Sequence, residues 1–296
     1  MVSFEGKVAI VTGAGRGLGA SHAKLLASLG ASVVVNDLGG SATGTGASTA
    51  PAEEVVAEII AAGGRAVANF DSVSENPEGI VASAIDAFGK LDVVVNNAGI
   101  NQAHAFEGDI MASIRKHMEV HFYGTAGVTA AAWPHLIASG EGRVVNTTSP
   151  TLVGFPEQTP YVSAKGAILA FTRTLAFEGA PLGIKINAIA PTAASRMSDE
   201  ADLPEDFKQF MRDNLPASLV SPVVAYLASA GCAINGEVLE TQGGAVKRFV
   251  LGLNGGYANT ELTADLVGEH IAEILDASTH VPFATIDQQD LSAVGK

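Results

Sequence analysis

The feature that most constrains the fold lies near the N-terminus, where a short apolar run is followed directly by a cluster of glycines. Residues 7–12 are Lys-Val-Ala-Ile-Val-Thr, which is typical of a buried parallel strand. Residues 13–19 are Gly-Ala-Gly-Arg-Gly-Leu-Gly, and a helical pattern continues from there to Leu29. Glycines at this point allow a tight turn, so that a pyrophosphate can approach the amides at the helix N-terminus. The segment predicts a dinucleotide site, with a plain glycine-rich turn as the alternative.

Alternating strand and helix patterns continue from this segment to about Gly244. Strands are expected near 7–12, 32–37, 65–70, 91–96, 142–148, 184–190 and 236–241. Such alternation produces a parallel sheet covered on both faces, and 296 residues with 47% hydrophobic content can bury a large core. We therefore expect an α/β fold, a doubly wound seven-stranded parallel sheet of the Rossmann type, in a single domain of residues 1–244. Residues 245–296 are expected to form a C-terminal extension packed on this core or on an oligomer interface.

The second expected strand ends at Asp37, about 20 residues after the glycine cluster. An acidic side chain at this place can accept hydrogen bonds from the adenosine ribose of NAD, and it repels the 2′-phosphate of NADP. Arg16 is the counter-argument, because a guanidinium inside the glycine cluster can pair with a phosphate. We weigh Asp37 more heavily, so the sequence favours NAD.

Tyr161 and Lys165 are four residues apart in a segment with a helical pattern, which places both side chains on one face of the helix. A phenol with a pKa near ~10 is a poor base at neutral pH, and a fixed neighbouring cation stabilises the phenolate. Such a pair also arises by chance on helix surfaces, but here it accompanies a predicted dinucleotide site. We therefore expect Tyr161 to exchange a proton during catalysis.

Composition and simple patterns argue against several other classes of function. The net charge of −14 argues against nucleic acids and anionic membranes as partners. The single Cys232 excludes an intramolecular disulfide, and no run is long and apolar enough to cross a membrane. The first residues lack signal-peptide character and the last residues are not a peroxisomal address, which favours a cytoplasmic location. His117 and His121 have ligand spacing on a helix, but without a His-Glu-x-x-His pattern we expect no metal.

Several of these segments together resemble the short-chain dehydrogenase/reductase family. The resemblance rests on residues 12–19, on Asn-Asn-Ala-Gly at 96–99, on residues 187–191, and on Ser149, Tyr161 and Lys165. It covers essentially the whole core and implies hydride transfer to or from a nicotinamide. It also implies that Tyr161 is the acid/base, that Lys165 lowers its pKa and binds the nicotinamide ribose, and that Ser149 orients the reacting oxygen. The residues implied at the cofactor are Thr12, Gly13, Gly15, Arg16, Gly17, Leu18, Gly19, Asp37, Asp71, Ser72, Asn97, Ala98, Gly99, Tyr161, Lys165, Pro191 and Ala193.

Other segments resemble, more narrowly, the (3R)-hydroxyacyl-CoA dehydrogenase domains of the peroxisomal multifunctional enzyme type 2 group. These segments are residues 35–40, 68–73, 190–197 and 203–206, with a weaker similarity in the tail after Gly244. We expect a dehydrogenase that stands alone, without fused hydratase or sterol-carrier parts.

Two positions depart from the family pattern. Counted back from Tyr161, the catalytic hydroxyl falls on Thr148, whereas counted forward from the preceding strand it falls on Ser149. We choose Ser149, although either hydroxyl could donate a hydrogen bond. The helix asparagine that holds a water behind the lysine in the family is replaced by His121. We place His121 among the catalytic residues, with a purely structural role as the alternative.

Three further regions have expected roles. The helix that bears Tyr161 and Lys165 is apolar almost all round, which predicts a homodimer or homotetramer, with a covering loop of the same chain as the alternative. Residues 39–51 are rich in Gly, Ser and Thr and are expected to form a loop near the adenosine end of the cofactor. Residues 192–215 are a second irregular segment, expected to bind substrate at the carboxyl edge of the sheet.

The residues and the resemblance together predict NAD-dependent oxidation of the 3-hydroxyl of an (R)-3-hydroxyacyl-CoA, in the β-oxidation of lipid or steroid side chains. Tyr161 is expected to take the hydroxyl proton while hydride passes to NAD. The alternatives are an NADPH-linked 3-oxoacyl reductase, a hydroxysteroid dehydrogenase, and a catalytically silent dinucleotide sensor that regulates a partner.

Overall fold

The computed structural model describes residues 2–195, 198–199, 203–279 and 281–282. The chain divides into two compact units, residues 1–248 and 249–296. The second unit contains the short helices α10 (Ala264–Glu269) and α11 (Ile271–Ile274) and an antiparallel pair of strands, β9 (Gly252–Leu253) and β10 (Val281–Pro282). Across the described ranges, no helix is both long and apolar enough to span a membrane.

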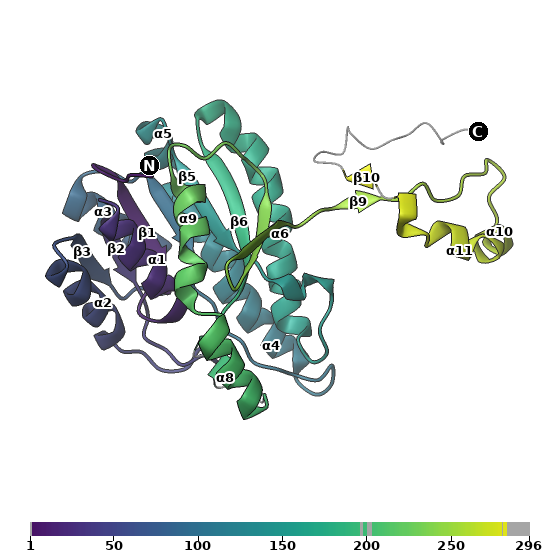
Figure 1. Ribbon diagram of the computed structural model, residues 1–296, viewed down its shortest axis with the longest axis horizontal. Coiled ribbons are helices and arrows are strands. Elements are labelled where there is room, and N and C mark those ends of the chain that lie inside the picture. Colours follow the sequence, from purple (N-terminus) through teal and green to yellow (C-terminus); the bar gives the residue numbers. More distant parts are fainter. Residues whose placement is uncertain (1, 196–197, 200–202, 280, 283–296) are drawn as a thin grey trace. The chain divides into compact units, whose positions relative to one another are not determined.

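The first unit is built around one eight-stranded sheet with the order β3-β2-β1-β4-β5-β6-β7-β8 (Figure 1). Its strands are β1 (Val8–Thr12), β2 (Ser32–Asn36), β3 (Arg65–Asn69), β4 (Val93–Asn96), β5 (Arg143–Thr147), β6 (Lys185–Thr192), β7 (Val238–Gln242) and β8 (Ala245–Arg248). Strands β1 to β7 pair in parallel, and every residue of β1, β2 and β5 is buried, as expected when helices cover both faces. The strand order reverses between β1 and β4, and ligands bind at such a switch point.

Helices cover both faces of this sheet (Figure 1). They are α1 (Gly17–Ser28), α2 (Ala50–Ala61), α3 (Pro77–Phe88), α4 (Ile110–His117), α5 (Gly124–Ser139), α6 (Thr159–Gly179), α8 (Glu205–Asn214) and α9 (Ser221–Ala228). Helices α1, α2 and α9 contribute to the core on one face, whereas α3, α5 and α6 contribute to the core on the other. The predicted doubly wound α/β fold is therefore confirmed.

The sheet has one strand more than the seven that the sequence predicts. Strand β8 pairs antiparallel with β7, with Gln242 opposite Ala245. The two residues between them, Gly243 and Gly244, have φ values of 54° and 84°, and a type I′ hairpin turn requires positive φ at both positions. All four residues of β8 are exposed, so its sequence lacks the apolar pattern that marks the other strands.

The segment 192–215, expected to be irregular, contains helix α8. Glu205 and Asp206 lie in the first turn of this helix and Arg212 lies in the last, an arrangement that the helix dipole favours. Residues 196–197 and 200–202 of this expected substrate segment lie outside the described residues.

Candidate active site

The glycine cluster forms a tight turn between β1 and α1 at the carboxyl edge of the sheet. Gly13 and Gly17 have φ values of 61° and 53°, and a Cβ added to Gly19 would lie 2.2 Å from the carbonyl oxygen of Gly13. Asn76 caps the N-terminus of α3, but no side chain in the described ranges caps the N-terminus of α1. The first amides of α1 can therefore bind an anion, and the turn fits the pyrophosphate of a dinucleotide.

Thr12 and Asn97 tie this turn to the end of β4. The Thr12 hydroxyl accepts hydrogen bonds from the backbone amides of Asn97 at 3.0 Å and Ala98 at 3.1 Å. The side-chain amide of Asn97 donates to the carbonyls of Thr12 and Gly13, both at 3.0 Å. The two glycine-containing segments predicted at the cofactor are thus in direct contact across the switch point.

Asp37 follows β2, where the sequence predicts it. Its carboxylate accepts hydrogen bonds from the amides of Gly15 at 2.7 Å and Gly39 at 2.6 Å. Each carboxylate oxygen keeps a further lone pair that can accept from a ribose hydroxyl. Arg16, the competing residue, is exposed at the N-cap of α1. A negative charge is therefore held beside the glycine turn.

Asp71 and Ser72 lie one strand further out, after β3. Asn69 and Asn76 donate to the Asp71 carboxylate at 2.7 and 3.0 Å. Asn36, at the end of β2, donates to the Asn69 side chain at 2.8 Å and to the Asp71 carbonyl at 2.9 Å. This chain of amides connects the expected adenine-binding residues to the strand that leads to Asp37.

The structure distinguishes the two candidate hydroxyls after β5. The Ser149 hydroxyl lies close enough to the Tyr161 phenol to lower its pKa by hydrogen bonding, and it lies 2.8 Å from the Thr151 hydroxyl. The Thr148 hydroxyl instead donates to the backbone carbonyl of Lys165 at 2.9 Å. The geometry therefore places Ser149, and not Thr148, beside the phenol.

Lys165 is 3% exposed and donates to the Thr147 carbonyl at 2.7 Å, and its Nζ lies 5.6 Å from the centroid of the Tyr161 ring. Burial lowers the pKa of Lys165 from 10.5 to about 7. Burial also raises the pKa of Tyr161 above its ordinary value, and the opposing hydrogen bond from Ser149 has the smaller effect. The protein alone thus does not show the expected lowering of the Tyr161 pKa, because burial favours the neutral forms of both groups.

His121 lies in a π-helical segment, Met118–Tyr123, that joins α4 to α5. Its Nε2 is 2.7 Å from the Ile100 carbonyl oxygen, and its ring meets the Tyr161 ring edge-on with 5.3 Å between centroids. A Cβ added to Gly99 would lie 2.5 Å from His121 Cε1, so a glycine is needed to make room for the imidazole. Burial holds the pKa of His121 well below 6.5. In the described part of the chain, no three His, Cys, Asp or Glu side chains are grouped so that they could hold a metal ion.

A buried polar network behind these residues was not predicted from the sequence. Asn96 donates to Thr129 and to Asn146, both at 2.9 Å, and Asn146 donates to Thr172 at 2.9 Å. All four side chains are buried, and they join β4 and β5 to helices α5 and α6. The available signal was an asparagine within or at the end of an apolar strand, where a polar side chain must find a partner.

The segment after β6 lies beside the glycine turn. A Cβ added to Gly17 would lie 3.8 Å from the Cβ of Ser195. Pro191 is next to the last residue of β6, Ala193 is buried in the core, and Leu18 packs against the same core. The predicted cofactor residues of the glycine turn and those at the end of β6 therefore lie beside one another at the carboxyl edge of the sheet.

Comparison with known proteins finds dehydrogenases that are similar over most of the chain. The family model of the short chain dehydrogenases matches residues 7–204. Rv0148 of Mycobacterium tuberculosis, described as a short-chain type dehydrogenase/reductase, is 44% identical over 282 residues, which cover 94% of this chain and 97% of that protein. Peroxisomal multifunctional enzyme type 2 of Mus musculus is 39% identical over 290 residues, and the match spans 96% of this chain but only 39% of the mouse enzyme. The structure of a 7α-hydroxysteroid dehydrogenase complexed with NADH and 7-oxo glycochenodeoxycholic acid matches with a TM-score of 0.73 and 28% identity, over 82% of this chain and 95% of the other.

Proposed function

The chain belongs to the short-chain dehydrogenase/reductase family of oxidoreductases, and we propose that it oxidises the 3-hydroxyl of an (R)-3-hydroxyacyl-CoA with NAD. The observation that carries this proposal is the convergence of Ser149, Tyr161 and Lys165 at the edge of the sheet where the glycine turn fits a dinucleotide. The acyl-CoA class is supported by the similarity to the peroxisomal multifunctional enzymes.

In this proposal each residue of the group has a separate task. Ser149 donates a hydrogen bond to the substrate oxygen, and Tyr161 accepts the hydroxyl proton. NAD, if held at the glycine turn, would supply the acceptor for the hydride of the carbon that bears the hydroxyl. Because burial raises the pKa of Tyr161, the phenolate needs a cation beside it, and the buried Lys165 ammonium lies 5.6 Å from the centroid of its ring. The N-terminus of α1 and the Asp37 carboxylate would hold the pyrophosphate and the adenosine ribose.

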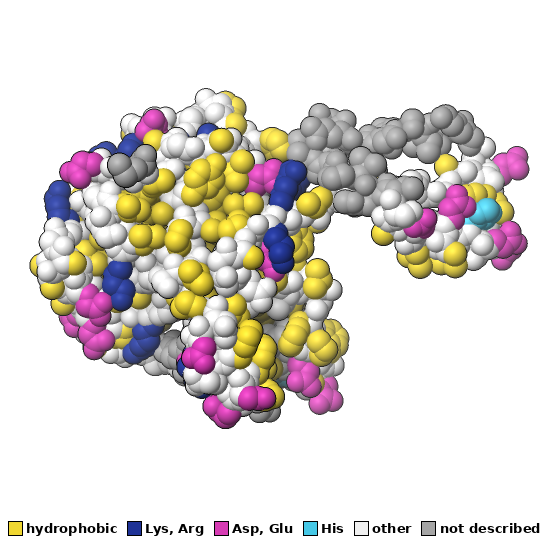
Figure 2. Space-filling view, in the orientation of Figure 1, with side chains coloured by type: hydrophobic (Ala, Val, Ile, Leu, Met, Phe, Trp, Pro, Cys, Tyr) yellow, Lys and Arg dark blue, Asp and Glu magenta, His cyan; other side chains and the backbone are white. Residues whose placement is uncertain are grey.

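Helix α8 supports an apolar substrate. Phe207 and Phe210 are 46% and 51% exposed and stack on each other with 6.3 Å between ring centroids. Figure 2 shows hydrophobic side chains gathered over this helix, with acidic groups beside them. An apolar surface on the expected substrate segment suits an acyl chain. It also suits a steroid, and a hydroxysteroid is the second candidate because the 7α-hydroxysteroid dehydrogenase is a structural neighbour.

We test the substrate and the cofactor together by following NADH or NADPH formation with a series of (R)-3-hydroxyacyl-CoA thioesters. The (S)-epimers and free hydroxysteroids are the controls. We expect turnover with the (R)-thioesters and a preference for NAD of roughly ten- to a hundredfold in kcat/KM, because a phosphate against Asp37 leaves a charged contact unpaired. Asp37→Ala should narrow this preference, chiefly by impairing the use of NAD.

Several outcomes would contradict the proposal. Turnover of steroids alone would select the second candidate, and equal use of NADP by the wild type would favour the NADPH-linked reductase, with Arg16 rather than Asp37 governing the choice. If the protein binds NADH but turns over none of these substrates, the dinucleotide sensor becomes the favoured hypothesis. Any measurable turnover removes that sensor.

A homodimer or homotetramer in the cytoplasm remains part of the proposal. Phe177, on α6, is 53% exposed, and Tyr123, at the end of the π-helical segment, is 54% exposed. Aromatic side chains exposed on these neighbouring helical segments are consistent with a partner surface. Sedimentation velocity at micromolar concentration should show a dimer or tetramer, and a stable monomer would contradict it.

A further inference from the structure

Two buried imidazoles lie in series behind the proposed acid/base. His117, at the end of α4, is 1% exposed and stacks on His121 with 6.0 Å between ring centroids and 10° between planes. His121 is also 1% exposed, and its ring meets Tyr161 edge-on. The change from α-helix to π-helix falls between the two histidines. Insertions of π-helix are frequent at functional sites.

The hydrogen bonds of His117 require one neutral tautomer. Its Nδ1 is 2.8 Å from the Ser113 carbonyl oxygen, which can only accept, so Nδ1 bears the proton. Its Nε2 accepts the backbone amide of Gln102 at 3.3 Å. A second proton on Nε2 would face this N–H donor. Both ring nitrogens therefore have partners, and the ring is held in one orientation.

His121 contacts the same backbone segment as His117, two residues earlier, at Ile100. Its Nε2 lies 2.7 Å from the Ile100 carbonyl oxygen and 3.2 Å from the Ile100 amide nitrogen, so one ring nitrogen faces both backbone groups of Ile100. Nδ1 is buried and has no partner among the described residues. His117 and His121 thus bind the backbone at Gln102 and Ile100, directly after the Asn97–Gly99 segment.

We propose that His117 is a positioning residue, which acts through its stack on His121 to hold the Tyr161 ring in its reactive orientation. The proposal rests on the assignment of Tyr161 as the proton acceptor in the proposed function. This role differs from a proton relay. A relay through the two rings would have to release a proton from Nδ1 of His117, and here the Nδ1–H group donates to the Ser113 carbonyl. Lys116 and Lys165 are the charged groups that act on the pair, and both disfavour a protonated imidazole.

Two substitutions separate the ring stack from the hydrogen bonds. His117→Phe keeps an aromatic ring against His121 but loses both hydrogen bonds, whereas His117→Gln keeps an acceptor for the Gln102 amide but loses the ring. His135→Gln, on α5, is the matched control for loss of an imidazole from the same stretch of helices. Each protein is checked for NADH binding by fluorescence and for thermal unfolding.

The first measurement is the ionisation of Tyr161, followed as tyrosinate absorbance and isolated by subtracting the same titration of Tyr161→Phe in each background. We expect His117→Gln to move the midpoint by about half a pH unit or more, and His117→Phe to stay closer to the wild type. The second is the pH profile of kcat, which should fall about tenfold in His117→Gln, because a small misplacement of a reacting group is costly. NADH affinity should change less than about twofold.

Two results would overturn the proposal. One is that both His117 variants give the same tyrosinate titration and the same kcat as the wild type and the His135→Gln control. The other is a His117→Phe protein that is more impaired than His117→Gln, which would show that the Gln102 hydrogen bond matters and the ring stack does not. The titration needs no substrate, so it tests this proposal even if the hydroxyacyl-CoA assignment fails.

Discussion

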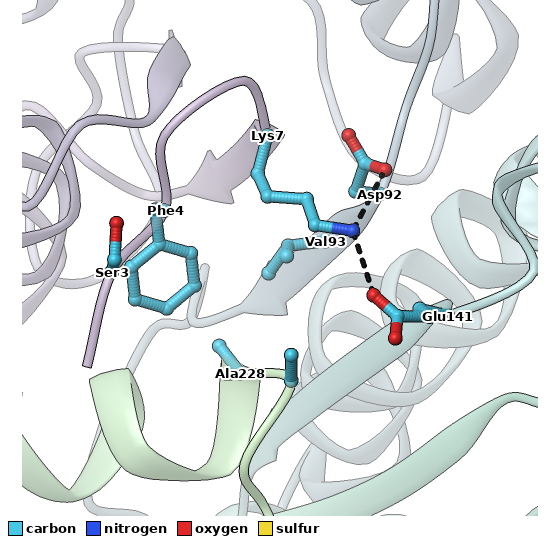
Figure 3. Close-up of a pocket in the computed structure, with 8 residues that line it drawn as sticks. Ser3, Phe4, Lys7, Asp92, Val93, Glu141 and Ala228 are labelled. Atoms are coloured by element: carbon cyan, nitrogen blue, oxygen red, sulfur yellow. Dashed lines mark hydrogen bonds and ion pairs between the residues drawn. The ribbon is translucent and has the colours of Figure 1, made fainter. Parts of the chain in front are cut away.

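Two buried charged side chains at opposite edges of the central sheet, Asp92 and Lys165, differ in how they are paired. At the amino edge, Asp92 is 2% exposed, and its carboxylate accepts the Val8 amide at 2.8 Å and pairs with Lys90 at 3.0 Å. Figure 3 shows Lys7 between Asp92 and Glu141, at 3.7 and 3.0 Å. The cavity that these residues line is about 10 Å³, which leaves room for one water at most.

At the carboxyl edge, buried polar groups remain unpaired. Lys165 donates to the Thr147 carbonyl, and among the described residues no carboxylate pairs with it. The hydroxyl of Thr147 and the Nδ1 of His121 are buried without a partner in the same part of the structure. Burial without a counter-charge lowers the pKa of Lys165 to about 7.

The comparison teaches that burial alone does not mark a functional group. A paired charge such as that of Asp92 stabilises the fold, whereas an unpaired charge such as that of Lys165 costs stability and is expected where chemistry is performed. Substitutions at the first edge should therefore change the free energy of unfolding, and substitutions at the second should change turnover.

The largest expected effect belongs to Tyr161→Phe at the carboxyl edge. Loss of the proton acceptor should lower kcat by roughly 10² to 10⁴-fold while NADH affinity and the unfolding midpoint stay near the wild-type values. Ser149→Ala should lower kcat in the same assay, and Thr148→Ala should lower it less, because the Thr148 hydroxyl is bound to the Lys165 carbonyl. Near-normal turnover in Tyr161→Phe, or a larger loss in Thr148→Ala, would break the assignment.

The second effect tests the amino edge. Asp92→Ala leaves the Val8 amide, the Ser139 hydroxyl and Lys90 without this acceptor, which should lower the free energy of unfolding by roughly 3 kcal/mol in urea titrations. Activity of the folded fraction should remain close to normal. Glu141→Ala is the control, because it removes a half-exposed partner of Lys7 and should cost less than about 1 kcal/mol. Equal losses in the two variants would mean that the buried Asp92 carboxylate stabilises the fold no more than the half-exposed Glu141 carboxylate does.

The smallest effect is a pH dependence of stability. Lys165 releases its proton near pH 7 in the folded protein but near 10.5 when unfolded, so between these values the unfolded chain binds more protons. Stability should therefore rise with pH across this window, by about 1 kcal/mol per pH unit from this group, and the gain should be lost as pH falls through 7. Urea titrations at pH 7.5 and 8.5 on the wild type and Lys165→Met measure it. An identical pH slope in the variant would mean that Lys165 keeps its charge in the folded state.

Much of the fold could be predicted because its signals are local. Each of the seven parallel strands lies within two residues of its predicted position at both ends, since apolar runs bounded by loops are visible in any short window. β8 was missed because its side chains are exposed and its pairing depends on the turn at Gly243 and Gly244. Helix α8 was missed because its helical signal lies in charges at its ends rather than in a long apolar pattern.

The site divides in the same way. Tyr161, Lys165 and the glycines were found from spacing along the chain, and the choice between Ser149 and Thr148 stayed open because both fit the spacing. Only contacts between distant segments separate them, since one hydroxyl meets the phenol and the other meets a backbone carbonyl. The network around Asn96 and the stack of His117 on His121 likewise join elements that are far apart in the sequence.

By itself, the sequence determined the periodic elements, the glycine turn and the types of residue that can perform the chemistry, because these depend on neighbours within a few positions. The tertiary structure alone decided which hydroxyl faces the phenol and which buried charges are compensated. It also decided the direction in which the pKa values of Tyr161 and Lys165 move, because burial is the largest cause of both shifts. Burial and pairing are properties of contacts across the fold, and no local window of residues contains them.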